Sequence, residues 1–209
     1  MTEEQKETIR FYTTNDYLLI NGLLWGEKDE IINEFITLIN NDGRAVMKEA
    51  EEAGFDVRWD CSIEEGKKLY EIYKKRFPFT KNEETRKQII DRAKQDIKNL
   101  TDCLKPLPND TVLYRNTKAK YFATIKEGDV FNCLGFSSCS LTPHNAENLM
   151  YGTNSDIMLK INAPKGTLAI KMDEYLDIAN EPDEVILPPT KFLIANIYKD
   201  QRLIHAICK

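Results

Sequence analysis

The sequence has few of the residues that mark metal-binding or disulfide-rich proteins. Its 209 residues include two histidines and five cysteines, and no two cysteines have the C-x-x-C spacing of zinc sites. The odd number and wide scatter of the cysteines argue against a disulfide scaffold and fit a reducing compartment. His144 and His205 lie far apart in the sequence, without nearby candidate ligands. We therefore expect no metal.

Long apolar runs, clustered basic residues and glycine-rich phosphate loops are also lacking. No run is long enough to span a bilayer, and the charged N-terminus lacks the apolar core of a signal peptide. With 29 basic and 34 acidic residues the net charge is −5, so no basic field indicates a nucleic acid or an anionic membrane. We expect a cytoplasmic protein, or an effector that is secreted or injected without a classical signal peptide. We expect neither a membrane nor a nucleic acid as its partner.

The two parts of the chain differ in their hydrophobic period. Up to residue 104, apolar residues recur at three- and four-residue spacing, which predicts helices over stretches that include 9–23, 31–39 and 89–104. The prolines at 106 and 108 end this pattern. After them, runs rich in β-forming residues predict strands at 111–115, 157–162, 168–172, 184–187, 192–198 and 203–208. Helices followed by strands indicate one α+β domain over 1–209, with a helical part (1–104) and a β-rich part (105–209).

Three polar residues stand at strand-like positions of the β-rich part. Arg115 ends one run, Ser138 lies in a serine-rich run at 137–140, and Glu184 begins a strand after an acidic segment. In this order they resemble the signature of mono-ADP-ribosyltransferases of the arginine–serine–glutamate class, a family that includes clostridial exoenzymes, binary toxins and the internal transferases of tailed phages. The resemblance implies an α+β fold with N-terminal helices, then two packed, mainly antiparallel β-sheets with an NAD cleft. It also implies transfer of ADP-ribose from NAD to a macromolecule, for which we expect a protein, with release of nicotinamide.

The chemistry of NAD cleavage explains why these residue types are needed. Breaking the nicotinamide–ribose bond passes through an oxocarbenium-like sugar, which requires a cation on the pyrophosphate and a fixed anion beside the reacting carbon. A planar guanidinium suits phosphate oxygens, so Arg115 is the phosphate candidate. The resemblance implies that Ser138 orients the catalytic glutamate, and that Glu184 holds the ribose 2′-hydroxyl and stabilises the oxocarbenium ion. The residues alone leave structural roles open: a surface arginine, a polar strand end and a solvated glutamate.

The first helical segment also resembles the family, and the resemblance places Tyr12 and Asn21 at the NAD site. Asn116, which follows Arg115 where a glycine is common, is expected at the cofactor as well. Trp25 stands where many relatives have a second phosphate-binding arginine. An indole cannot pair with a phosphate, so we expect Trp25 in the core, with stacking on adenine as the alternative.

By the resemblance, the segment 173–183 recognises the acceptor. It has five carboxylates and no basic residue, which favours a neutral or basic protein surface, with Tyr175 as an anchor. Pro182 occupies the position of the glutamate that arginine-modifying transferases carry, and of the glutamine in those that modify asparagine or glutamine. Glu181 or Asp183 could substitute if the loop bends. The sequence therefore does not identify the residue type that is modified in the acceptor. Two alternatives to a transferase stay open: an NAD glycohydrolase, and a catalytically inactive binding or decoy module of the same fold.

Overall fold

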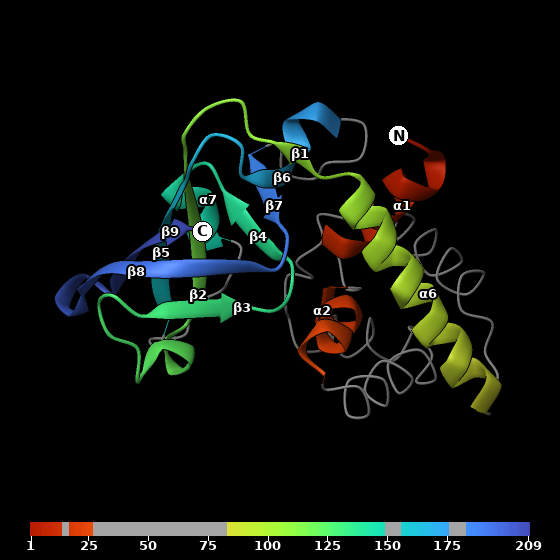
Figure 1. The fold of residues 1–209 in the computed structure, drawn as a ribbon, viewed down its shortest axis with the longest axis horizontal. Helices are drawn as coiled ribbons and strands as arrows, with labels where there is room; N and C mark the ends of the chain where they lie inside the picture. Colours follow the sequence, from red (N-terminus) through yellow and green to blue (C-terminus); the bar gives the residue numbers. More distant parts are fainter. Residues whose placement is uncertain (14–16, 27–82, 149–155, 176–182) are drawn as a thin grey trace, which may run out of the picture.

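The N-terminal helices lie together on one side of a single β-sheet (Figure 1). The computed structural model describes residues 1–13, 17–26, 83–148, 156–175 and 183–209. Among the described residues, three helices precede the sheet along the chain: α1 (Glu3–Phe11), α2 (Tyr17–Trp25) and α6 (Glu83–Asp102). The stretch predicted as helix over 9–23 overlaps both α1 and α2. The helix predicted over 31–39 lies outside the described residues.

Local sequence signals account for where these helices begin and end. At the start of α1, the Thr2 hydroxyl accepts a hydrogen bond from the Gln5 amide, and the Gln5 side chain accepts one from the Thr2 amide, which forms a capping box. The apolar stripe predicted for 89–104 is buried in α6 at Ile89 and Leu100. This helix ends at Asp102, shortly before Pro106. None of the described helices combines the length and the apolarity needed to cross a bilayer.

A buried polar cluster joins α1 to α6. The Thr8 hydroxyl donates to Asp96 Oδ1 at 2.9 Å and accepts from Asn99 Nδ2 at 3.1 Å. All three side chains are at most 5% exposed. Arg92 also lies 3.4 Å from the Asp96 carboxylate. Because buried polar groups are costly unless they are paired, this cluster fixes how the two helices pack against each other.

The described residues of the β-rich part form nine strands and several short helices. All six predicted strands overlap a strand of the structure, and β4 covers the serine-rich run at 137–140, whereas β1 and β3 were not predicted. The strands are β1 (Lys105–Pro106), β2 (Thr111–Lys118), β3 (Val130–Cys133), β4 (Ser137–Ser140), β5 (Asp156–Ala163), β6 (Leu168–Lys171), β7 (Glu184–Leu187), β8 (Thr190–Tyr198) and β9 (Leu203–Cys208). The short helices are η2 (Ala119–Phe122), α7 (Pro143–Asn148), η3 (Met172–Tyr175) and η4 (Lys199–Gln201).

The expectation of two packed sheets is wrong, because the described strands form one mixed sheet. Its order is β1-β6-β7-β4-β2-β5-β9-β8-β3, with β5 and β9 parallel and the other neighbours antiparallel. The sheet continues from β4 to β2 through the pairing of Tyr114 with Ser140. The α+β class itself is confirmed, with the N-terminal helices packed against a curled sheet.

Two hydrophobic cores lie on opposite faces of β7. Val185 and Leu187 belong to a core shared with β2, β5, β8 and β9. Ile186, which points the other way, belongs to a second core with residues of α1, α2 and α6. The same alternation places Glu184 on the Ile186 face, toward the helices. The first residue of β7 therefore lies where the helical part meets the sheet.

We expect the substitution Thr8→Val to lower the free energy of unfolding by roughly 1–3 kcal/mol, because it leaves Asp96 and Asn99 without the hydroxyl that links them. Urea titration followed by circular dichroism measures this change. The control is Thr101→Val, since the exposed Thr101 hydroxyl bonds only to the carbonyl of Ile97 on its own helix. Equal, small effects of both substitutions would show that the buried cluster does not stabilise the contact between α1 and α6.

Candidate active site

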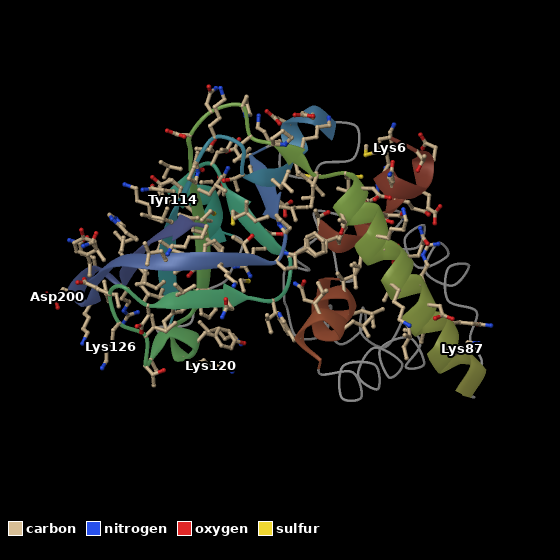
Figure 2. The ribbon with its side chains drawn as sticks, viewed as in Figure 1. Lys6, Lys87, Tyr114, Lys120, Lys126 and Asp200 are labelled. Atoms are coloured by element: carbon tan, nitrogen blue, oxygen red, sulfur yellow. The ribbon has the colours of Figure 1, made fainter. Side chains whose placement is uncertain are left out.

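The sequence-predicted residues meet along one row of three neighbouring strands. Tyr114 of β2 pairs with Ser140 of β4, and Ser140 pairs with Glu184 of β7. Tyr114 is labelled in Figure 2, where it marks β2 within the sheet. Arg115 follows Tyr114 directly, and Ser138 lies two residues from Ser140 on the same face of β4. Since adjacent strands are about 4.8 Å apart, this register brings positions 115, 138 and 184 into one small region.

Arg115 crosses the gap where the pairing of β2 with β4 stops. The pairing covers a single position, although an extended register would set Asn116 opposite Ser138. Instead, Arg115 Nη1 donates a hydrogen bond to the Ser138 backbone carbonyl at 2.7 Å. A side chain thereby bridges the strands where ladder hydrogen bonds are missing. Asn116, which follows Arg115 in the sequence, pairs with Met158 of β5 and is half-buried.

Glu184 is a buried carboxylate at the first position of β7, with an exposed fraction of 8%. The residue directly opposite it is Ser140, and Ser138 is its diagonal neighbour. The Ser140 hydroxyl accepts a hydrogen bond from the Thr142 amide at 3.1 Å, so it helps to form the turn after β4. Ser138, which is half-buried, is the serine that sequence analysis assigned to the glutamate.

The phenol of Tyr12 lies between these charged groups. Tyr12 is 2% exposed, and burial raises the pKa of its phenol well above the usual range. The positive charge of Arg115 and hydrogen bonding with Asn21 and Ser138 oppose this rise, whereas the charge of Glu184 adds to it. The phenol therefore keeps its proton at neutral pH. All four neighbours influence the pKa of the phenol, which therefore lies close to the cation, the serine and the carboxylate.

Asn21 is also buried, with an exposed fraction of 3%, and its amide bonds to the backbone that leads into β4. Its Nδ2 donates to the Phe136 carbonyl at 3.1 Å, and its Oδ1 accepts from the Phe136 amide at 2.8 Å. The Phe136 ring meets the Tyr12 ring edge to face, with the ring centres 5.9 Å apart. The structure thus brings Tyr12 and Asn21 together with the β4 strand.

The core location that we expected for Trp25 is wrong. Its side chain is 42% exposed at the last position of α2, one turn after Asn21. The helix ends there, and Gly26 has a φ of 84°, a left-handed conformation that suits glycine at a helix C-terminus. Because Trp25 is the last residue of its helix, the helical periodicity of the sequence did not indicate whether it is exposed.

Asp183 is fixed by contacts with the segment after β4. Its backbone carbonyl accepts from the Leu141 amide at 3.0 Å, and its carboxylate accepts from Asn145 Nδ2 at 2.7 Å. Asn145 belongs to α7, whose first turn is capped by the Thr142 hydroxyl. Sequence analysis predicted no helix in this stretch. Threonine followed directly by proline is a helix-start signal that could have revealed it.

Much of the acceptor segment lies beyond the described residues, including Glu181 and Pro182, whose expected roles therefore stay predictions. Tyr175 is the last residue of η3. Two of the five carboxylates of this segment are paired with lysines outside it: Glu174 lies 2.7 Å from Lys105 Nζ, and Asp173 lies 2.7 Å from Lys171 Nζ.

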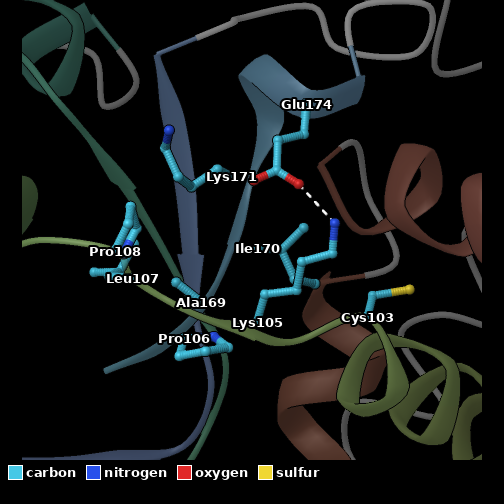
Figure 3. Close-up of a pocket in the computed structure, with 9 residues that line it drawn as sticks. All are labelled: Cys103, Lys105, Pro106, Leu107, Pro108, Ala169, Ile170, Lys171 and Glu174. Carbon is cyan, nitrogen blue, oxygen red and sulfur yellow. Dashed lines mark hydrogen bonds and ion pairs between the residues drawn. The ribbon is translucent and has the colours of Figure 1, made fainter. Parts of the chain in front are cut away.

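Lys105, Lys171 and Glu174 also line a small cavity at β1 and β6 (Figure 3). Its volume of about 20 Å³ suits one water molecule and not a dinucleotide, so it is distinct from the candidate site. Figure 3 shows the Lys105–Glu174 ion pair spanning this cavity from β1 to η3. In the described part of the chain, no three His, Cys, Asp or Glu side chains gather as metal ligands would.

The chain is similar to known proteins in sequence and in fold. The family model for ADP-ribosyltransferase exoenzymes matches residues 76–201. The solved structure of the ADP-ribosyltransferase Vis, a toxin from Vibrio splendidus, in complex with agmatine aligns over 99% of this chain and 74% of its own, with a TM-score of 0.56 and 15% identity. This likeness shows the fold. The C3 exoenzyme of Clostridium limosum aligns over 100% of this chain and 86% of its own (TM-score 0.48, 15% identity). C3stau2 from S. aureus, solved with NAD, aligns over 61% and 72% (TM-score 0.42, 19% identity). No curated protein matches the chain.

We expect the Cys139 thiol to resist alkylation by iodoacetamide at about pH 8 in the folded protein and to react fully in urea. It is 0% exposed, and burial raises its pKa to about 12, despite the opposing charge of Arg115, so the reactive thiolate is scarce. Peptide mass mapping measures the labelling. The half-buried Cys133, four residues before Ser137, is the comparison thiol. Equal labelling of both thiols in the native state would show that β4 is not packed as described.

Proposed function

Because this chain belongs to the ADP-ribosyltransferase exoenzyme family, we propose that it transfers ADP-ribose from NAD to a protein acceptor and releases nicotinamide. The observation that supports this proposal most strongly is the grouping of one cation, one serine and one buried carboxylate at the β2–β4–β7 row. Composition or fold alone does not carry an activity, because the same fold can host different chemistry.

In this proposal Arg115 holds the pyrophosphate of NAD. A guanidinium has several N–H donors in one plane, so it can keep the bond to the Ser138 carbonyl and still donate to phosphate oxygens. That bond also fixes the direction of the side chain before the dinucleotide arrives. Asn116, the next residue of β2, would lie beside the nicotinamide end of the substrate.

Glu184 would act at the reacting carbon. As the bond between the ribose C1′ and the nicotinamide nitrogen breaks, the bonding electrons leave with nicotinamide, and positive charge develops on the ribose. A buried carboxylate held at the start of a strand stabilises that charge more strongly than an exposed one. Ser138 would orient the carboxylate. A nucleophilic atom of the acceptor then bonds to C1′ and loses its proton, which completes the transfer.

The acceptor site would be formed by the segment 173–183. Tyr175 and Asp183 flank its undescribed part, and the Asp183 carboxylate is already fixed by Asn145. Because Lys105 and Lys171 offset Glu174 and Asp173, the negative charge of this segment is concentrated toward its later residues. We propose a neutral or basic protein surface as the acceptor, contacted by Tyr175, Pro182 and Asp183.

Water is the second candidate acceptor, which would make the protein an NAD glycohydrolase. The observation that favours it is Pro182, whose side chain cannot hydrogen-bond an acceptor group. The bond-breaking step and the roles of Arg115, Ser138 and Glu184 would be the same.

We expect the substitution Glu184→Gln to lower both transfer and NAD hydrolysis by about a hundredfold or more, because the amide keeps the shape of the side chain and loses its charge. The assay incubates the protein with labelled NAD and a cell lysate and measures released nicotinamide and labelled protein separately. Labelled protein supports the transferase, and nicotinamide release without labelling supports the glycohydrolase.

The matched control for this assay is Glu127→Gln, which removes a carboxylate in the turn before β3 while keeping the oxygen that accepts from the Ile197 amide. We expect its rates to stay within about twofold of wild type. If Glu184→Gln behaved like this control, Glu184 would not be the catalytic carboxylate. Absence of both products with the wild-type protein would favour the inactive binding module.

We expect Arg115→Ala to weaken NAD binding by about tenfold to a hundredfold, the loss typical of a hydrogen bond to a charged group. Arg115→Lys should restore only part of the affinity, since an ammonium lacks the planar fork. Calorimetric titration with NAD, carried out in the Glu184→Gln background to prevent turnover, gives the dissociation constants. Lys118→Ala, which removes an exposed charge from the same strand, is the control. If Arg115→Ala bound NAD as tightly as this control, Arg115 would have a structural role alone.

A further inference from the structure

We propose that Asn21 is a positioning residue that holds β4 in place through the Phe136 backbone, and that its amide is not a direct ligand of NAD. The catalytic part of this inference rests on the proposed function. Its structural part, the pair of hydrogen bonds between Asn21 and Phe136, stands independently and can be tested without any activity.

The two hydrogen bonds pair one edge of the Asn21 amide with both backbone groups of Phe136. The Phe136 amide can only donate and its carbonyl can only accept, so Oδ1 must face the first and Nδ2 the second. The side chain thus satisfies both backbone groups of Phe136, as a neighbouring strand would. With 3% of Asn21 exposed, no substantial part of this amide is left to face a dinucleotide.

The residue before Phe136 leaves the space that this contact needs. A Cβ atom on Gly135 would lie 2.6 Å from Asn21 Oδ1 and 2.9 Å from Trp25 Nε1. Both distances are shorter than real carbon contacts, so any other residue at position 135 would displace the Asn21 amide or the indole. Asn21 and Trp25 are four residues apart, on one face of α2, and that face therefore packs directly against the backbone leading into β4.

The contact is close enough to the site to set its geometry. Phe136 and Ser138 lie two residues apart on one face of the extended chain, and the Ser138 carbonyl bonds to Arg115. The Tyr12 ring contacts the Phe136 ring. The pKa of the Tyr12 phenol is influenced by Asn21, Ser138, Arg115 and Glu184, so these residues lie near it. A shift of Phe136 would therefore move the serine and the carbonyl that orients the arginine. Misplacement of catalytic groups by about 1 Å is enough to cost large factors in rate.

The main test is Asn21→Asp, which keeps the acceptor for the Phe136 amide and replaces the donor by an oxygen that repels the Phe136 carbonyl. We expect kcat for nicotinamide release to fall by about tenfold or more, while the dissociation constant of NAD, measured in the Glu184→Gln background, changes by less than about twofold. A residue that binds NAD directly would show the reverse, a weaker affinity with kcat retained. That result would overturn the proposal.

The pH dependence of this variant gives a second readout. A buried carboxyl group beside a carbonyl has a raised pKa, and below that pKa its proton can be donated to the Phe136 carbonyl. The activity of Asn21→Asp relative to wild type should therefore rise as the pH falls from about 8 to about 5.5. Taking the ratio removes the titration of groups that both proteins share, including Glu184. A ratio that is constant with pH would count against the hydrogen bond to Phe136.

Gly135→Ala tests the same contact from the other side. The added Cβ should displace the Asn21 amide and lower kcat with little change in NAD affinity, as Asn21→Asp does. The matched control is Leu134→Ala, the neighbouring residue, which is 54% exposed and should leave both constants within about twofold of wild type. Wild-type kcat in Gly135→Ala would contradict the proposal.

Amide hydrogen exchange separates this inference from the proposed function. Exchange at Phe136 should be about tenfold faster in Asn21→Ala than in Asn21→Asp, because only the aspartate variant keeps an acceptor for that amide. If Glu184→Gln left the activity unchanged, the proposed function would fail while this exchange difference could still be observed. Equal exchange in the two variants would overturn the structural part of the inference.

Discussion

The arrangement of the site depends on one interruption in the sheet. In the described structure β2 and β4 pair through Tyr114 and Ser140, and Arg115 bridges the place where further ladder bonds would form. A backbone carbonyl left without a partner there would cost roughly 1–3 kcal/mol if it were buried, and the guanidinium offsets that cost by donating to Ser138. The same side chain can therefore join two halves of the sheet and present a cation beside the carboxylate of Glu184.

The polar groups around this interruption are held by the backbone and by one another. Asn21 hydrogen-bonds to the backbone before β4, and Ser140 hydrogen-bonds to the turn after β4. Asp183, the residue before Glu184, hydrogen-bonds to that turn and to α7. Each bond satisfies a group that would be costly to bury alone, and together they fix both ends of β4 and the start of β7. Polar groups fixed in this way need little rearrangement when charge develops on a substrate. Such preorganisation is commonly the largest contribution to catalysis.

The sequence was sufficient to predict most of the strands but not which strands pair with one another. Alternation and turn residues located six strands, and the order of arginine, serine and glutamate identified the residues that meet at the row. The pairing of β2 with β4 through Tyr114 and Ser140 was missed, because the sequence of neither strand indicates which strand it pairs with. The roles of Gly135 and Phe136 were missed for a related reason. A glycine that makes room for a side chain more than a hundred positions away looks, in sequence, like an ordinary turn residue.

The distribution of charge indicates how such a site would bind an anionic substrate. The net charge is −5, and the lysines labelled in Figure 2 are dispersed, with Lys87 on α6 and Lys126 in the turn before β3. Lys105 and Lys171, which lie nearer to the acceptor segment, are paired with its own carboxylates. Long-range attraction therefore adds little, and salt should affect binding less than it does at a basic surface. In the proposed function, the attraction for a pyrophosphate would come from short contacts, for which Arg115 is already oriented by the Ser138 carbonyl. Binding would then depend on the placement of this guanidinium, and that placement depends on the position of β4.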